Sequence, residues 1–353
     1  MLDMNKYFAA LDAGSEDITL VAARWGKNGE CSIEGSCRSA SKGLRKGVVT
    51  DAAAAIDSIA GAVDKLRKKT GKNIQEIYAA VSSTSVNIIP SSGTLLLSKY
   101  GREITDRDVS KCVDIASTVK MPIGTEPLHR IIRSFSIDSE KGIKNPLSLE
   151  GVKLGADVNI LTVDHSVLNN MTKCISQAGL IPAGFVFSGL ASSYRALTDE
   201  EKTGGVALVD IGKDLTEVVF FFHGIVGNCK VLSLGTSDIC SENEGINRSV
   251  LEELLVDMKD LPGWDKINKV VVIGGGALVD GMIELLDSLL EVPTQAGTCI
   301  AKPFEDLPQG RAGYVCSLGV LDYLQERKLE QKLGNNPFKR GYDRVLGFVD
   351  RYF

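Results

Sequence analysis

Short apolar runs alternate with polar turns along most of the chain, and two distant stretches repeat one arrangement. Tyr7–Trp25 and Val206–Gly224 each consist of an apolar strand that ends in Asp, a turn that contains Gly, and a second apolar strand. Alternation of this kind is typical of half-buried strands. The matching turn residues are Asp12 and Gly14 in the first stretch and Asp210 and Gly212 in the second. The repeat predicts two lobes that begin with the same strand–turn–strand unit.

The first lobe continues with further strands and one clear helix. In Ala52–Thr70 the apolar residues recur at helical spacing, Asp51 can cap the start of the helix, and Gly71 can end it. The predicted strands are Phe8–Asp12, Ile18–Trp25, Cys31–Arg38 and Ile77–Val81. Residues 1–83 are therefore expected to form the first part of lobe 1.

The pattern changes over residues 84–157, for which we expect an inserted α+β subdomain. Thr105 begins a stretch with an apolar helical face, and His129–Asp138 has the alternation of a strand. Val158–Val163 is then expected to return to lobe 1, whose second part is residues 158–188.

The second lobe is expected over residues 189–326. Its predicted helices are Ala191–Leu197, Ser249–Lys259, a helix from the glycine run to Leu290, and Gly313–Glu326; its later strands are Val231–Leu234 and Val270–Ile273. Residues 235–248 alone separate the third strand from the next helix. A polar linker, residues 327–336, leads to a final segment, residues 337–353.

Composition supports this α/β interpretation and excludes several classes of protein. A chain of 353 residues with 44% apolar residues fits two or three soluble globular domains. The net charge of −5, without a basic stripe, argues against nucleic-acid binding. The eight cysteines form no CxxC pair and the three histidines have no ligand partner at metal spacing, so a zinc site is not expected. The N-terminus shows no apolar signal segment.

The duplicated turn has a use in phosphate chemistry. Backbone N–H groups of two such turns can hold a phosphate chain from two sides, and the acids Asp12 and Asp210 can hold the water shell of Mg²⁺. In the first turn, Gly14 permits close approach of the backbone and Ser15 adds a hydroxyl donor. A single turn of this type is more often an ordinary hairpin, and only the pair indicates a nucleotide site.

Two further motifs are less regular. The second turn, Asp210–Thr216, carries Gly212 and Thr216. It also carries the bulky residues Lys213, Asp214 and Leu215, which weaken the case for hydrolysis, although Lys213 can act as a point charge. Gly274, Gly275 and Gly276 follow a strand and precede a predicted helix, whose N-terminus would favour an anion. The alternative for this run is a tight strand–helix turn.

The last residues predict a short cationic amphipathic helix. Its apolar stripe and flanking charges suit a helix that lies on an anionic membrane surface, whereas a helix docked on the protein's own core is the alternative. The candidate membrane-binding residues are Phe338, Lys339, Arg340, Tyr342, Arg344, Val345, Leu346, Val349 and Phe353.

Together, the hairpin repeat, the glycine run and the insert resemble the actin/Hsp70 ATPase superfamily, and more closely the FtsA family of bacterial division proteins. The segments that carry the resemblance are Gly43–Asp51, Lys141–Leu154 and Phe187–Gly212, in the family's order. The resemblance implies a two-lobed actin-like ATPase fold with duplicated RNase H-like lobes, an inserted α+β subdomain and a C-terminal amphipathic helix.

The resemblance also implies function. Members of the family bind ATP and Mg²⁺, with phosphate contacts from the loops that match Asp12–Ser15, Asp210–Thr216 and Gly274–Gly276. They associate into filaments and tether FtsZ, or organise other division proteins, at the cytoplasmic face of the bacterial inner membrane, bound peripherally to its anionic lipid. The resemblance assigns no catalytic residue here.

One departure from the family concerns residues 235–248. The family carries a whole subdomain, called 2B, in this interval; it walls the adenine side of the cleft, receives the FtsZ tail and contributes filament contacts. Its reduction weakens the case for ATP binding, FtsZ binding and assembly. Three interpretations remain open: a division scaffold with weak or absent hydrolysis, a working ATP switch, and a PilM-like membrane-assembly adaptor or FtsA paralogue with a different partner.

Overall fold

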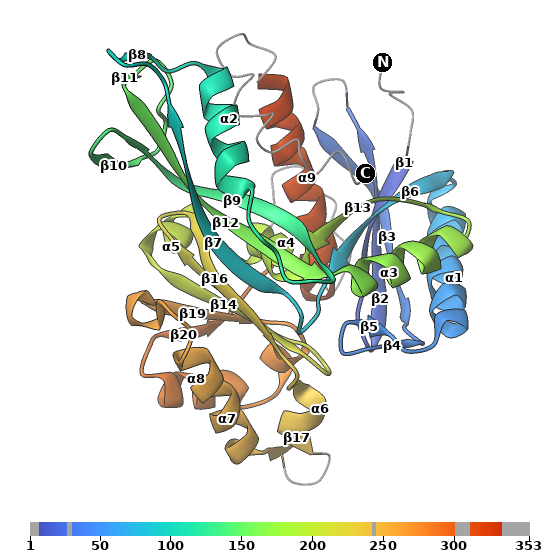
Figure 1. Cartoon of the computed structure of the whole chain (residues 1–353). Helices are drawn as coiled ribbons and strands as arrows, with labels where there is room; N and C mark the ends of the chain where they lie inside the picture. Colours follow the sequence, from blue (N-terminus) through green and yellow to red (C-terminus); the bar gives the residue numbers. More distant parts are fainter. Residues whose placement is uncertain (1–6, 27–29, 242–244, 301–310, 334–353) are drawn as a thin grey trace. The chain divides into compact units, whose positions relative to one another are not determined.

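A computed structural model describes residues 7–26, 30–241, 245–300 and 311–333 (Figure 1). The chain divides into two compact units. The first combines residues 1–86 with 164–323, and the second combines residues 87–163 with 324–353. Most of both predicted lobes belongs to the first unit, and most of the predicted insert belongs to the second.

Lobe 1 is built on a five-stranded sheet of order β13-β6-β1-β2-β3. The strands are β1 (Tyr7–Ala13), β2 (Asp17–Trp25), β3 (Cys31–Ala40), β6 (Ile74–Val81) and β13 (Ile181–Phe187). Helices α1 (Ala52–Thr70) and α3 (His165–Gln177) pack against each other and share an apolar core with this sheet (Figure 1). As predicted, the Asp51 carboxylate accepts from the Ala54 N–H at 3.1 Å, and Gly71 ends α1 in the left-handed conformation. A small hairpin, β4 (Leu44–Arg45) and β5 (Val48–Val49), lies between β3 and α1 in the chain.

Lobe 2 repeats the topology of lobe 1. Its sheet has the order β20-β19-β14-β15-β16, in which a central antiparallel hairpin, here β14–β15, again has a parallel strand on one side and an antiparallel strand on the other. The strands are β14 (Val206–Ile211), β15 (Thr216–Phe222), β16 (Ile225–Leu232), β19 (Lys269–Ile273) and β20 (Thr294–Ala296). The matching strand orders confirm the duplication that the two sequence stretches indicate.

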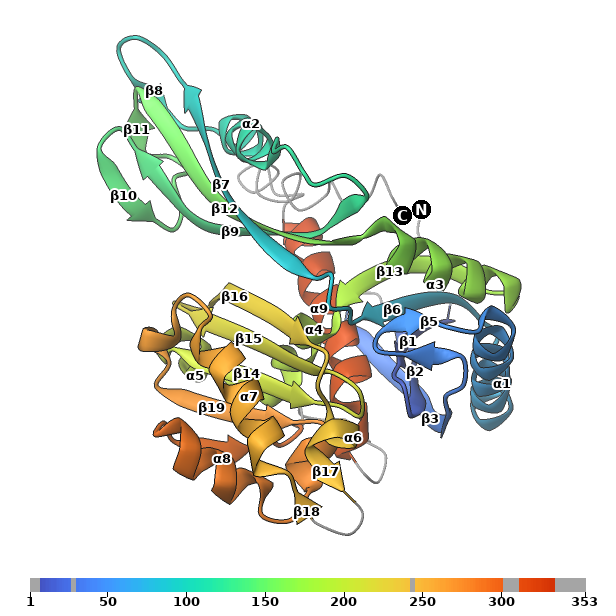
Figure 2. The same cartoon turned by 60° about the horizontal axis from the view of Figure 1, so that its bottom comes forward.

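Helices cover the lobe 2 sheet. Helices α7 (Arg248–Lys259) and α8 (Met282–Leu290) share an apolar core with the lobe 2 sheet and lie on the same side of that sheet (Figure 2). Helices α4 (Ser188–Ala196) and α5 (Asp199–Gly204) contact β14 and β15. The helix α9 (Val315–Leu333) approaches α4 so closely that a Cβ on Gly319 would lie 1.9 Å from the Ala191 carbonyl oxygen.

The second unit is an α+β fold, as predicted for the insert. Its sheet has the order β10-β9-β12-β7, and α2 (Asp106–Ser117) packs on β7. The strands are β7 (Asn87–Leu96), β9 (Thr125–Ile137), β10 (Glu140–Ile143) and β12 (Lys153–Asp164), with a two-stranded pair of β8 (Arg102–Glu103) and β11 (Glu150–Gly151). Thr105 and Asp108 form a capping box that starts α2.

The predicted return of Val158–Val163 to lobe 1 is wrong. This stretch is part of β12, which pairs with β7 along its length up to the pair Thr162 and Asn87. The pairing with β7 keeps the apolar run in the sheet of the insert. The insert therefore ends later than the predicted boundary at Asp157.

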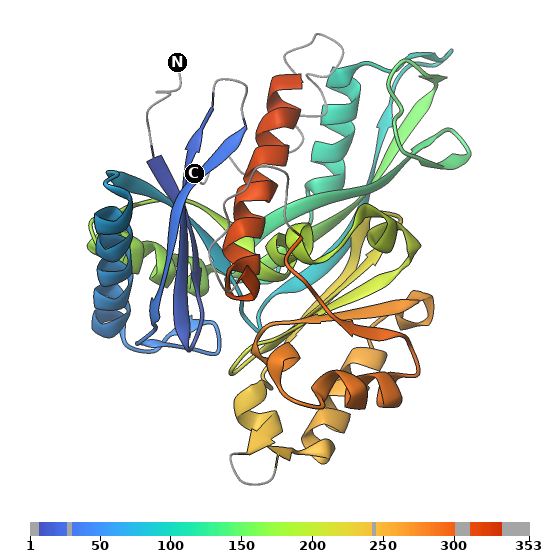
Figure 3. The same ribbon diagram turned by 180° about the vertical axis from the view of Figure 1, so that it is seen from behind.

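Two predicted boundaries in lobe 2 also differ. The predicted linker after Glu326 begins as helix, because α9 continues to Leu333 through residues with good helix propensity; Figure 3 shows α9 as one unbroken helix. The helix expected to start at the glycine run is divided into a 3₁₀ turn, Gly275–Leu278, and α8. Gly281, with a φ of 78°, separates them.

The interval that would hold subdomain 2B contains only small elements where it is described. These are α6 (Thr236–Ile239) and a hairpin of β17 (Cys240–Ser241) and β18 (Gly245–Ile246); residues 242–244 are not described. Among the described helices, none is both long and apolar enough to cross a membrane. The candidate membrane-binding helix, residues 337–353, lies outside the described residues.

Candidate functional site

The two matching turns have the same backbone hydrogen bond. The Gly14 N–H donates to the Asp17 carbonyl at 3.0 Å, and the Gly212 N–H donates to the Leu215 carbonyl at 2.9 Å. A Cβ on either glycine would lie 3.2 or 3.1 Å from the same carbonyl oxygen, so a larger residue would crowd the turn. The two residues at the corner of each turn therefore correspond: Ser15 and Glu16 in lobe 1, Lys213 and Asp214 in lobe 2.

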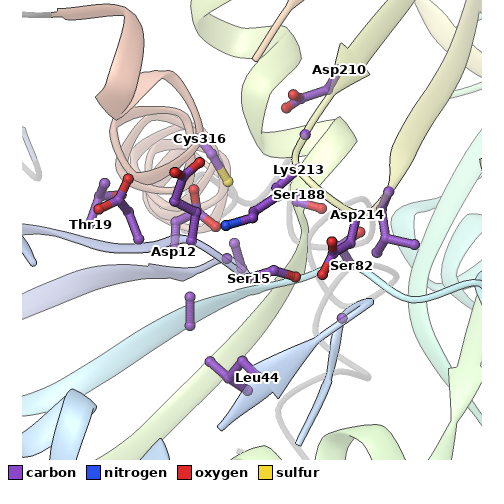
Figure 4. A pocket seen from close by; sticks show the side chains of 18 of the residues that line it. Asp12, Ser15, Thr19, Leu44, Ser82, Ser188, Asp210, Lys213, Asp214 and Cys316 are labelled. Atoms are coloured by element: carbon purple, nitrogen blue, oxygen red, sulfur yellow. The ribbon is translucent and has the colours of Figure 1, made fainter. Parts of the chain in front are cut away.

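Both turns line one pocket of about 250 Å³ within the first unit (Figure 4). Lobe 1 supplies the first turn together with residues from β3, β6 and the β4–β5 hairpin, and lobe 2 supplies the second turn. Figure 4 shows Asp12 and Ser15 on one side and the Lys213 side chain extending into the space from the other turn. The predicted meeting of the two turns is thus present in the structure.

The pocket brings most of the predicted site residues together. Those that line it are Asp12, Gly14, Ser15, Asp210, Gly212, Lys213 and Gly275. Thr216, Gly274 and Gly276 are not among the lining residues. Thr216 is fully buried, and its hydroxyl donates to the Leu234 carbonyl at 2.8 Å. Its role in the structure is to fix the end of β15.

Packing accounts for two of the three glycines in the run. Gly274 has a φ of 81°, and a Cβ there would lie 2.3 Å from an Asp210 carboxylate oxygen. A Cβ on Gly276 would lie 2.5 Å from the Ile211 Cβ. A Cβ on Gly275 meets nothing nearer than 3.9 Å, and Gly275 is the member of the run that faces the pocket. The run is therefore a close-packed strand–turn junction that exposes one residue to a ligand.

Asp210 and Glu217 form a buried carboxylate pair in lobe 2. They are partners across β14 and β15, and Glu217 is only 7% exposed. Burial raises the pKa of Glu217 to about 7, while a hydrogen bond from the Ser188 hydroxyl, 2.5 Å away, acts in the opposite direction. Burial and the charges of Glu217 and Asp12 raise the pKa of Asp210 well above its ordinary value. The pair therefore holds a proton at pH values where a solvated pair would not.

Asp12 extends this group of acids from lobe 1. Burial raises the pKa of Asp12 to about 6, although a hydrogen bond from the Cys316 thiol partly offsets that rise. Burial and the nearby acids in turn raise the pKa of the Cys316 thiol. A cation placed among Asp12, Asp210 and Glu217 would favour their ionised forms.

Three of these residues were not singled out from the sequence: Ser188, Glu217 and Cys316. Glu217 had a usable signal, because it is an acid inside the otherwise apolar strand TEVVFFF and stands opposite Asp210 in any hairpin of this register. Ser188 begins α4 and Cys316 lies at the start of α9. Only the tertiary fold brings them to the pocket, so no local pattern could have identified them.

The charge of the pocket limits what it can bind. Among the described lining residues, six carboxylates face two cationic side chains, those of Arg38 and Lys213. Arg38 is paired with Asp17, and Asp214 accepts from the Ser237 hydroxyl at 3.2 Å. A polyphosphate in this setting needs a divalent cation to offset repulsion. The described residues contain no group of three or more His, Cys, Asp or Glu that could hold a metal ion directly.

Residues 235–248 contribute little to the lining of the pocket. Many lining residues come from the two turns, whereas among the described residues of 235–248 only Thr236 lines it. The N–H groups of Thr236 and Ser237 donate to the carbonyls of Gly212 and Lys213 at 2.9 Å each, so α6 rests on the second turn. Within the described residues, this interval forms no wall for a base.

Comparisons with known proteins find FtsA proteins among those similar to this chain. Residues 84–162 match the model of the SHS2 domain inserted in FtsA. The chain is 32% identical to the cell division protein FtsA of Borreliella burgdorferi over 229 residues, which cover 65% of this chain and 55% of that protein. It is 27% identical to FtsA of Pseudomonas aeruginosa, covering 67% of this chain and 56% of that protein. The chain spans about half the length of these relatives, and the resemblance found in the sequence is confirmed.

A solved structure confirms the fold class. The chain is similar to a chain of the PilM–PilN type IV pilus biogenesis complex, with a TM-score of 0.62 and 16% identity, covering 92% of this chain and 98% of that one. At this identity the likeness concerns the fold alone. It agrees with the two-lobed actin-like architecture seen in the duplicated sheets.

Proposed function

We propose that this chain, which is similar to the FtsA cell division proteins, is an actin-like scaffold of division that works at the cytoplasmic face of the bacterial inner membrane. The observation that carries this proposal is a contrast between two parts of the chain. The FtsA-type insert has a complete sheet and helix, whereas the interval of residues 235–248 has only α6 and the β17–β18 pair where it is described. A protein built in this way retains a partner-binding unit and has little to hold a nucleoside.

In this proposal ATP and Mg²⁺ bind weakly, and hydrolysis is weak or absent. The N–H groups at the corners of the two turns and the Ser15 hydroxyl would hold the phosphates, while Asp12 and Asp210 would hold Mg²⁺ through water. Mg²⁺, when bound, would supply the positive charge that the acid-rich pocket lacks. Gly275, which is open to the pocket, would allow the ligand to approach the backbone.

The scaffold function requires attachment to the membrane and a partner. Residues 337–353 would supply a peripheral anchor, because their sequence predicts an apolar stripe flanked by cationic residues. Anchoring concentrates the insert in two dimensions and thereby favours binding of FtsZ or another division protein, and self-association into filaments. With the 2B interval reduced, the insert is the larger surface available for a partner.

The test is recruitment of fluorescent FtsZ to liposomes that contain anionic lipid. The full chain should bind the liposomes and recruit FtsZ, and deletion of residues 337–353 should abolish both. Changing Phe338 and Val349 to Asp should act like the deletion if the helix lies on the bilayer. Liposome binding without FtsZ would replace this proposal with an anchored paralogue that serves another division protein.

The second candidate is a PilM-like membrane-assembly adaptor. One observation favours it: the chain covers nearly all of the PilM structure but only about half of the FtsA relatives. Such an adaptor would bind a short cytoplasmic tail of an inner-membrane protein. Binding of a PilN-type tail peptide by this chain, together with failure to recruit FtsZ, would favour the adaptor over the division scaffold.

A further inference from the structure

The β4–β5 hairpin, Leu44–Val49, touches both turns that line the pocket. Its tip is Lys46 and Gly47, whose φ values of 50° and 72° lie in the left-handed region. On the side of lobe 1, the Lys46 N–H donates to the Ser15 hydroxyl at 3.2 Å. A Cβ on Gly47 would lie 1.9 Å from the Ser82 carbonyl oxygen, so the tip is packed tightly against the end of β6. The tip is therefore fixed to lobe 1 and to its turn.

The same hairpin makes polar contacts with lobe 2. The Lys46 ammonium donates to the Ser233 hydroxyl at 2.8 Å and to the Ser233 carbonyl at 3.2 Å. The Arg45 guanidinium lies 4.0 Å from a carboxylate oxygen of Asp214, at the corner of the second turn. The Leu215 side chain of that turn comes within 3.2 Å of the Cβ position of Gly47. Leu44 and Gly47 also line the pocket.

We propose that the β4–β5 hairpin is a latch that holds the two lobes closed around the pocket without a nucleotide. In this arrangement Lys46 supplies the main polar link, to Ser233, and Arg45 partly neutralises Asp214. The link is made by protein groups on both sides, so closure does not need a ligand between the turns. This inference concerns the pocket and is independent of the partner and of the membrane helix.

The latch explains why a second turn with bulky corner residues can persist. When a nucleotide holds two lobes together, small corner residues are required for close contact with the phosphates. Here, Asp214 and Leu215 of the second turn meet the hairpin instead. Asp214 and Leu215, two of the bulky residues that weaken a phosphate site, thus take part in the contact between the lobes.

The test is the distance between the lobes, measured by double electron–electron resonance on the full chain without nucleotide. Spin labels are placed on exposed positions of α1 and α7, residues 68 and 256, through a keto amino acid that leaves the native thiols unlabelled. The wild-type chain should show one narrow distance. Lys46→Ala should raise the population at longer distance about threefold, the effect expected for loss of one exposed charged contact.

Two variants make the result decisive. Lys42→Ala removes an exposed lysine of the same loop and should leave the distance distribution unchanged. Ser233→Asp places a carboxylate beside Lys46 and should narrow the distribution or lower the long-distance population. The latch is overturned if Lys46→Ala matches wild type, if Ser233→Asp opens the lobes, or if the wild-type distribution narrows only when ATP and Mg²⁺ are added.

Discussion

The turns of β1–β2 and β14–β15 have the same backbone but different side chains. Each begins with Asp and closes with the same glycine hydrogen bond. Opposite Asp12 stands Thr19, whose hydroxyl lies 3.2 Å from that of Ser317, whereas opposite Asp210 stands Glu217. Lobe 1 thus places one acid at the base of its turn, and lobe 2 places two.

The comparison separates the features that the two turns share from those that differ. Both turns have Asp at the end of the first strand and Gly where the backbone is crowded. The other side chains differ with the element that each contacts. Thr19 on β2 contacts Ser317 of α9, whereas Asp214 of the second turn lies near Arg45 of the β4–β5 hairpin. The two lobes therefore share the backbone of the turn and differ in the charge that they place around the pocket.

The largest effect is expected when Thr19 of lobe 1 is replaced by glutamate, the residue at the corresponding position of lobe 2. Thr19→Glu puts a carboxylate at a position that is 4% exposed, beside Ser317 and opposite Arg38, whose guanidinium is already paired with Asp17. We expect a loss of about 3 kcal/mol in the free energy of unfolding at pH 8 and a smaller loss at pH 5, where the new acid is protonated. Urea unfolding at both pH values measures it. Thr19→Val is the control of similar shape, and an equal loss at both pH values would contradict the explanation by charge.

Two glycines of the run in lobe 2 are expected to have different roles: Gly276 in packing and Gly275 in ligand contact. Gly276→Ala should lower the free energy of unfolding by about 2 kcal/mol, because its methyl group would overlap Ile211. Gly275→Ala should change stability little, because a Cβ there has space, but it should weaken nucleotide binding, because Gly275 lines the pocket. Thermal unfolding and nucleotide titration measure the two effects. Equal destabilisation by both variants would contradict this division of roles.

The raised pKa values of Glu217 and Asp12 should make the protein less stable as the pH rises. The pKa of Glu217 is raised from 4.5 to about 7 and that of Asp12 from 3.8 to about 6, so the folded chain binds more protons than the unfolded chain between these values. Stability should therefore fall as pH rises from about 4 to 7 and level off above it. Glu217→Gln should make this fall smaller, as read from urea unfolding across that pH range.

The exposed Glu16 provides the control for that experiment, because it lies at the pocket without being buried. Glu16→Gln should leave the slope of stability against pH unchanged. If the two variants give the same slope, burial of Glu217 is not the cause.

The smallest expected effect comes from making the second turn resemble a phosphate loop. Replacing Lys213 and Asp214 by glycine removes a carboxylate from the pocket and opens the corner of the turn. We expect tighter binding of ATP with Mg²⁺ by roughly fivefold, about 1 kcal/mol, measured by isothermal titration. The matched change in lobe 1, Glu16→Gly, should give less, since Glu16 is exposed. Weaker binding by the double variant would show that Lys213 contributes more than Asp214 costs.

The sequence predicted the features that depend on local pattern. The duplicated hairpin, helix α1 with its caps, and the α+β insert all follow from periodicity and end residues, and the structure contains them. Three boundaries differed, for different reasons: β12 stays in the insert by pairing with β7, α9 continues past Glu326 through residues with good helix propensity, and Gly281 separates α8 from the glycine run. Glu217, Ser188 and Cys316 reach the pocket from three separate elements, and the contact between Lys46 and Ser233 joins residues from different lobes. Such meetings depend on the whole fold.

The short interval between β16 and α7 has a consequence for selectivity. Of the described residues in that interval, only Thr236 lines the pocket. In the proposed function, the two turns would hold the phosphates of a nucleotide, and that interval would contact its base very little. We therefore expect ATP and GTP to bind this chain with similar affinity.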